Sequence, residues 1–219
     1  MIRVLLATVA LVGCTQMQSA RTLRTGDTRV SAGISRMSIS DDTQLIPFYL
    51  GELHVAYGVT DTAEVGLQLG RSAGIGDAIS SVGVAPKISL HETRAIAVSL
   101  AFPGVVAWDE SRTLSPSVAA AAYPTLYVGL QLDGETEVVL SPRVGGVWRP
   151  GSGDSSNVFL LGGAVGLSIG APARATVQPE IGILLVQSST TDHREAVFTI
   201  GFGVTAGNGS AARRYARRP

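Results

Sequence analysis

The chain of 219 residues has a single cysteine, Cys14, so it cannot form an internal disulfide. Aromatic residues make up only 5% of the chain, which is sparse for a protein that lies at a membrane interface. The apolar run 4–12 is too short to cross a bilayer as a helix. The fold must therefore be stabilised without disulfide bonds.

Motifs for catalysis or metal binding are also missing. The sequence has no Gly-x-Ser-x-Gly elbow, phosphate loop or dinucleotide fingerprint. Its three histidines, His54, His91 and His193, lie far apart and do not have the spacing of metal ligands. We therefore predict a non-enzymatic protein with no cofactor and no metal site. A lipid-modifying activity that depends on His54 is a minor alternative.

The amino terminus has the pattern of an exported protein. Arg3 precedes the apolar run 4–12, and the following Leu11-Val12-Gly13-Cys14 resembles the lipobox of bacterial lipoproteins. This resemblance implies a signal peptide over 1–13 and a lipid on Cys14, with 14–26 as a lipid-anchored tether. An ordinary secretory signal that happens to contain a cysteine is the alternative.

Loss of residues 1–13 removes only Arg3 from the charged residues, so 16 of the 17 basic residues remain beside 17 acidic ones. The mature chain therefore has a net charge of about −1, which argues against a nucleic-acid partner. The basic tail 207–219 contains four arginines, and we predict that it is solvated.

From residue 27 to residue 206 the sequence has the period of two that is typical of β-strands. In 63–70, for example, Val65 and Leu67 alternate with Glu64 and Gly66. The predicted strands are 28–37, 50–59, 63–70, 78–90, 95–102, 126–132, 137–148, 159–169, 174–185 and 196–205.

The predicted connections alternate between long and short. The long ones are 38–48, 71–77, 104–117, 149–155 and 187–194, and the short ones centre on 60–62, 91–93, 133–134 and 170–172. In an up-and-down sheet, alternate connections lie at the same rim, so one rim should carry tight turns and the other longer loops. An even number of strands would place both ends of the barrel at the tight-turn rim.

The two faces of these strands differ in chemistry. One face carries Val, Leu, Ile and Phe with almost no charge, and the other carries mainly Gly, Ala and Ser. A soluble sheet would expose a more polar second face, whereas a small closed barrel needs small residues inside. We therefore predict an all-β, antiparallel up-and-down β-barrel of about ten strands, embedded in a membrane. Its lumen would contain a polar network of Glu52, His54, Glu64, Lys87, Glu137, Arg143, Arg174 and Glu180.

This pattern resembles small bacterial outer-membrane β-barrel proteins, in particular lipoprotein versions. The resemblance rests on Ala20-Arg21-Thr22-Leu23 with Gly26, and on Tyr57-Gly58-Val59-Thr60-Asp61 followed by Glu64-Val65-Gly66-Leu67. It implies the outer membrane of a Gram-negative bacterium, with both termini periplasmic and Cys14 in the inner leaflet. Outer-membrane lipid would then be the main partner.

No motif in this pattern specifies an activity. We predict a structural, adhesive or limited transport role, in which the long loops contact the envelope or external ligands. About ten strands leave a lumen largely filled by side chains, so a wide porin-like pore is not expected. The alternative is a lipid-tethered soluble periplasmic barrel or sandwich that binds an apolar ligand. The oligomeric state stays open.

Overall fold

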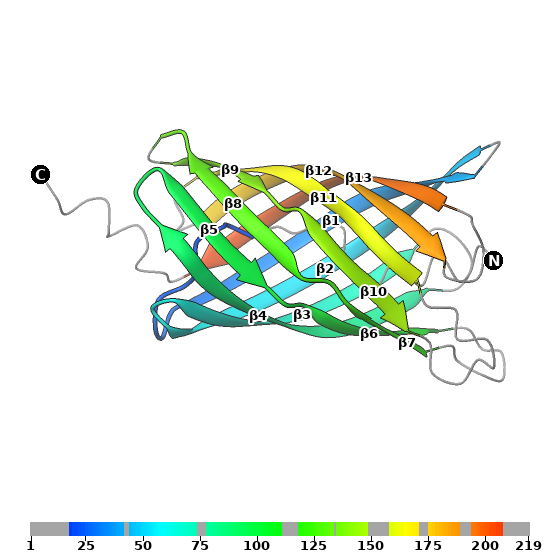
Figure 1. The fold of residues 1–219 in the computed structure, drawn as a ribbon, viewed down its shortest axis with the longest axis horizontal. Coiled ribbons are helices and arrows are strands. Elements are labelled where there is room, and N and C mark those ends of the chain that lie inside the picture. Colours follow the sequence, from blue (N-terminus) through cyan, green and yellow to red (C-terminus); the bar gives the residue numbers. More distant parts are fainter. Residues whose placement is uncertain are drawn as a thin grey trace, which may run out of the picture.

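A computed structural model describes residues 18–41, 44–73, 78–110, 118–133, 135–148, 158–170, 175–188 and 194–207. The strands of these residues form one closed antiparallel β-barrel, which confirms the predicted fold class (Figure 1). Pairing between β1 and β13 closes the ring. The predicted signal peptide, Cys14, Arg174 and the tail from residue 208 lie outside the described residues. The strands are β1 (Thr28–Asp41), β2 (Gln44–Thr60), β3 (Ala63–Ala73), β4 (Ile79–Glu92), β5 (Ile96–Ala101), β6 (Gly104–Asp109), β7 (Val118–Ala122), β8 (Thr125–Gln131), β9 (Thr136–Leu140), β10 (Arg143–Trp148), β11 (Val158–Ile169), β12 (Ala175–Ser188) and β13 (Arg194–Gly207).

The described residues form thirteen strand segments, where the sequence predicted about ten strands. The three additional segments have a local cause. Proline has no amide hydrogen for the ladder, and Pro103, Pro124 and Pro142 separate β5 from β6, β7 from β8, and β9 from β10. Each pair nevertheless continues along the same neighbours, since β5 and β6 both pair with β4. The segment β6 also occupies residues that the sequence assigned to a loop, and β7 lies in 118–122, which the sequence assigned to no element.

The barrel has two distinct rims. The strand ends that flank the connections 61–62, 93–95, 132–135 and 170–174 lie at one end, here called the short-turn rim. The strand ends that flank the connections 42–43, 74–78, 110–117, 149–157 and 189–193 lie at the other end, here called the long-loop rim. The predicted long loop 38–48 is wrong, because Asp41 pairs with Gln44 and the ladder between β1 and β2 continues almost to the turn. Arg29 pairs with Gly207, so β1 begins and β13 ends at the short-turn rim.

The outward face of the wall is apolar. On β3, outward-facing Leu67 is 47% exposed, whereas inward-facing Glu64 is 3% exposed. The same alternation on the other strands leaves Val, Leu, Ile and Phe exposed around the ring. Soluble monomers rarely expose a contiguous apolar area larger than a few hundred Å². The outward face therefore suits lipid and argues against the alternative of a soluble barrel or sandwich.

Exposed aromatic side chains occur near both rims of this face, with Tyr57 near the short-turn rim and a larger group near the long-loop rim. Tyr49, Trp108, Trp148 and Phe159 are exposed and lie towards the long-loop rim. Such amphipathic rings are typical of a membrane–water interface. Phe48 and Tyr123, in contrast, are buried inside the barrel. Among the described residues, no helix is long and apolar enough to span a membrane.

Candidate functional site in the barrel lumen

The described residues that precede the turn before β1 lie inside the barrel rather than outside it. Residues 18–23, here called the plug segment, are placed in the lumen near the short-turn rim, and Ala20, Thr22 and Leu23 are buried there. The predicted tether 14–26 therefore contains, in its described part, a segment that is held by the wall.

A tight turn connects the plug segment to β1. The amide of Asp27 donates to the Arg24 carbonyl at 3.0 Å, and Gly26 has a φ of 83°. A positive φ at the third position of such a turn strongly favours glycine. The amide of Gly26 donates to the Gly58 carbonyl on β2 at 2.9 Å, and the Gly58 amide donates to Asp27 at 2.9 Å. The turn thus reverses the chain from the lumen into the wall.

Glu64 is the centre of a buried ion cluster beside this segment. Its Oε1 lies 2.6 Å from Arg29 Nη2 and 2.8 Å from Lys87 Nζ. Glu64 and Lys87 face each other directly across β3 and β4. Arg29 comes from β1, and the small residues Ala56 and Gly58 on β2 lie between it and β3. Lys87 also lies 5.4 Å from the centroid of the Tyr127 ring, within the range of a cation–π interaction.

The same charged groups bind the backbone of the plug segment. The amide of Leu23 donates to Glu64 Oε2 at 2.6 Å. Lys87 Nζ donates to the carbonyls of Ser19 and Arg21, at 3.0 and 3.4 Å. Buried charges are tolerated only with partners, and the plug segment provides part of that set.

A second contact holds the side chains of the plug segment. Ser19 Oγ donates to Glu137 Oε2 at 2.7 Å. The Arg21 guanidinium lies 3.1 Å from Glu92 Oε1 and donates to the carbonyls of Thr93 and Arg94 at the rim. Its Nε is 3.9 Å from Glu137 Oε1. Arg21 therefore spans the distance between the lumen and the short-turn rim.

Glycines in the wall provide the space for these contacts. A Cβ at Gly129 would lie 2.1 Å from Glu137 Oε1 and 2.8 Å from the Cβ of Ala20. One at Gly58 would lie 1.8 Å from the Arg24 carbonyl oxygen. At Gly66 it would overlap the His54 ring, whose Nε2 is 3.4 Å from Gln18 Nε2. The wall is thus shaped to accept this segment.

The structure brings four of the predicted network residues to the plug segment: His54, Glu64, Lys87 and Glu137. Arg143 and Glu180 are buried and Glu52 is partly buried, each at an inward position of its strand. Arg29 and the plug segment were missed. The available signal in the sequence was the alternation of apolar Val30 and Ile34 with Ser31 and Ser35, which places Arg29 on the same face as the serines.

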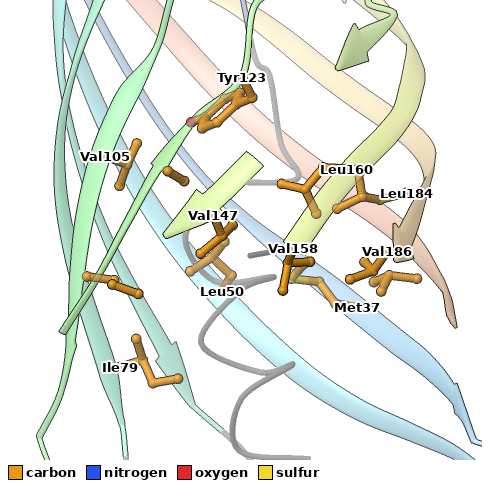
Figure 2. Close-up of a cluster of buried hydrophobic side chains, with 14 of the residues drawn as sticks. Met37, Leu50, Ile79, Val105, Tyr123, Val147, Val158, Leu160, Leu184 and Val186 are labelled. Atoms are coloured by element: carbon orange, nitrogen blue, oxygen red, sulfur yellow. The ribbon is translucent and has the colours of Figure 1, made fainter. Parts of the chain in front are cut away.

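The half of the lumen near the long-loop rim is apolar, contrary to the small and polar inner face that the sequence suggested. Figure 2 shows Met37, Leu50, Val147, Leu160 and Leu184 directed from the wall into the interior. Tyr123 belongs to this cluster, and its hydroxyl accepts a hydrogen bond from Gln68 Nε2 at 2.7 Å. The full cluster is Met37, Phe48, Leu50, Ile79, Val105, Ala107, Ala119, Ala121, Tyr123, Val147, Val158, Leu160, Leu184, Val186 and Val197.

The described residues contain no group of three or more His, Cys, Asp or Glu side chains that could hold a metal ion. What the geometry shows is a closed barrel with an apolar outside, a charged inner half and a segment of its own chain bound to those charges.

The fold belongs to the class of closed antiparallel barrels found in bacterial outer membranes. An outer membrane channel from Pseudomonas putida F1 has a similar fold, with a TM-score of 0.54 and 13% identity over 88% of this chain and 99% of that one. The translocator domain of the autotransporter NalP from Neisseria meningitidis gives a TM-score of 0.40 at 10% identity, covering 94% of each chain. No protein-family model and no curated protein matches the chain. At these identities the likeness shows the fold alone.

Proposed function

We propose that the protein is a non-enzymatic outer-membrane β-barrel lipoprotein with a limited transport role, and that its plug segment closes the lumen at the short-turn rim. The observation that carries the proposal is the binding of the plug backbone by Glu64 and Lys87. The apolar outward face supports the membrane location. Solutes would pass only when the plug segment leaves these contacts.

The contacts favour a removable segment over a permanent part of the wall. Residues 18–23 have no strand pairing, and side chains of the wall make much of their polar contact. A segment bound in this way can leave without breaking a ladder of β1–β13. The groups that remain, Arg29, Glu64, Lys87 and Glu137, would then line a polar constriction.

The proposal includes the lipid on Cys14 and periplasmic termini, with the short-turn rim on the periplasmic side. Gln18 contacts His54, which precedes Thr60 at the rim by six positions, or about 20 Å along β2. Cys14 lies four positions before Gln18 in the sequence, and four positions span at most about 14 Å. A lipid on Cys14 that is inserted in the periplasmic leaflet could therefore not be reached while Gln18 contacts His54. Insertion of the lipid would pull Gln18 away from His54 and favour the open lumen.

The test is solute flux into liposomes that contain the refolded barrel. Replacement of residues 19–23 by glycine and serine at constant length removes the Arg21 side chain and the buried side chains of Thr22 and Leu23 and leaves mainly backbone contacts. The segment should then leave the lumen more often, and the swelling rate should increase severalfold while the wall stays intact. Thr25→Ala, which removes only a rim contact between Thr25 Oγ1 and Asp61, is the matched control and should leave the rate low. Equal, low flux in all three proteins would contradict a transport role.

A further inference from the structure

Charge on the outward face of the wall is confined to one side. Arg36 on β1, Arg71 on β3 and Arg194 on β13 occupy outward positions, and each lies in the half of its strand nearer the long-loop rim. Among the strand residues whose side chains are described, no Asp, Glu or Lys faces outward, although exposed Glu110 directly follows β6. Arginine in a lipid-facing wall is costly unless it finds an anionic partner or reaches the headgroup level.

The aromatic residues fix the level at which these arginines lie. Arg36 pairs directly with Tyr49 across β1 and β2. Arg71 pairs with Ser80 on β4, and Ser80 pairs in turn with Trp108 on β6. Both arginines therefore lie in the same rows of the wall as exposed interfacial aromatic residues. This places them at the headgroup level of the leaflet near the long-loop rim.

Arg36 and Arg71 are neighbours in the wall, since β1, β2 and β3 lie side by side (Figure 1). Two strand spacings and an offset of two residues separate their Cα atoms by about 12 Å. Arg71 Nη2 contacts Glu110 Oε2 at 2.6 Å, and Glu110 also accepts a hydrogen bond from Ser80. The Arg71 side chain is still 68% exposed, so its other donors face outward.

We propose that Arg36 and Arg71 form a binding site for a phosphate-bearing lipid headgroup in the leaflet at the long-loop rim. Guanidinium groups bind phosphate through paired, charge-assisted hydrogen bonds, and their fixed charge is retained at the membrane surface. Two arginines whose Cα atoms lie about 12 Å apart can reach the two phosphate groups of one glycolipid. Tyr49, between β1 and β3, packs against the lipid beside the headgroup. The site rests on the proposed membrane location but not on a transport role.

The experiment uses the full barrel in bilayers of phosphatidylcholine that contain bisphosphorylated lipid A as the probe. The measured quantity is the lipid A retained after detergent extraction, for wild type, Arg36→Gln/Arg71→Gln and Arg94→Gln. Each arginine near a membrane surface increases the affinity for anionic lipid about fivefold. The double variant should therefore retain roughly 25-fold less lipid A if the two free energies add. The control Arg94→Gln removes an exposed arginine at the short-turn rim and should behave as wild type.

Equal retention by the double variant and wild type would overturn the site, as would equal retention of dephosphorylated lipid A. Displacement of the lipid by an equal concentration of inorganic phosphate would show a free-anion site and also overturn it. If the double variant does not fold, Arg36→Gln alone, with an expected loss of about fivefold, gives the same decision. Failure of the wild-type barrel to enter bilayers would instead contradict the proposed function, so the two failures are distinguishable.

Discussion

The two halves of the lumen share one fold and one strand period but differ in chemistry. Near the short-turn rim, Arg29, Glu64, Lys87 and Glu137 are buried, whereas near the long-loop rim the buried residues include Leu50, Leu160 and Leu184. The charged half coincides with the plug segment, whose backbone supplies hydrogen-bond partners. The difference indicates that charged side chains are buried where a segment outside the strand ladder can provide their hydrogen-bond partners.

The largest expected effect comes from the centre of the charged half. Glu64→Gln leaves Lys87 and Arg29 buried close to each other without the carboxylate that neutralises them. Breaking a buried ion pair costs about 3–5 kcal/mol, and we expect a loss of that size in the free energy of unfolding. Urea unfolding in micelles, followed by tryptophan fluorescence, measures it. Glu135→Gln, at an exposed turn position, is the control, and an equal effect of both changes would contradict the cluster.

The apolar half should respond through packing alone. Leu160→Ala removes a fully buried side chain and should lower the free energy of unfolding by about 2–5 kcal/mol. Leu161→Ala changes the adjacent, outward-facing residue, which is 50% exposed, and should cost less than about 1 kcal/mol. The same urea titration measures the loss in the free energy of unfolding for both variants. Equal losses would mean that the interior of this half is not packed.

A smaller effect should follow from closing the space that the plug segment uses. Gly129→Ala puts a methyl group against Glu137 and Ala20, and we expect a loss of about 1–3 kcal/mol together with faster solute flux. Gly104→Ala is the matched control, because nothing lies within 4 Å of its Cβ position. That change should be neutral or stabilise the barrel by up to about 1 kcal/mol. The prediction fails if both alanines behave alike in thermal unfolding.

The smallest effect belongs to the short-turn rim outside the lumen. The amide of Glu135, and that of Thr136, donate to Asp133 Oδ1 and hold the pKa of Asp133 below its usual range. Because the folded pKa is lowered, this contribution to stability is present above the unfolded pKa and is lost as the pH falls through the folded one. Asp133→Asn should therefore reduce the midpoint temperature slightly at neutral pH and not at acidic pH. An equal reduction at both pH values would contradict this origin.

The sequence predicted much of the wall because strand orientation follows from neighbours in the chain. Val65 and Leu67 face outward and Glu64 faces inward, as the alternation indicated. The breaks at Pro103, Pro124 and Pro142 were not predicted from the sequence, since strand pairing across a proline depends on the neighbouring strand. The pairing of Asp41 with Gln44 was likewise not predicted, because the segment around it contains many polar residues and resembles a loop.

The all-β class and the inward position of His54, Glu64, Lys87 and Glu137 follow from the sequence alone. These features depend on a period of two, which is a pattern of neighbouring residues in the chain. The position of Ala20 and its neighbours in the lumen follows only from the tertiary structure. The partners of this segment come from β3, β4 and β9, and their inward faces meet only when β1 pairs with β13. A contact that needs ring closure leaves no periodic signal along the chain.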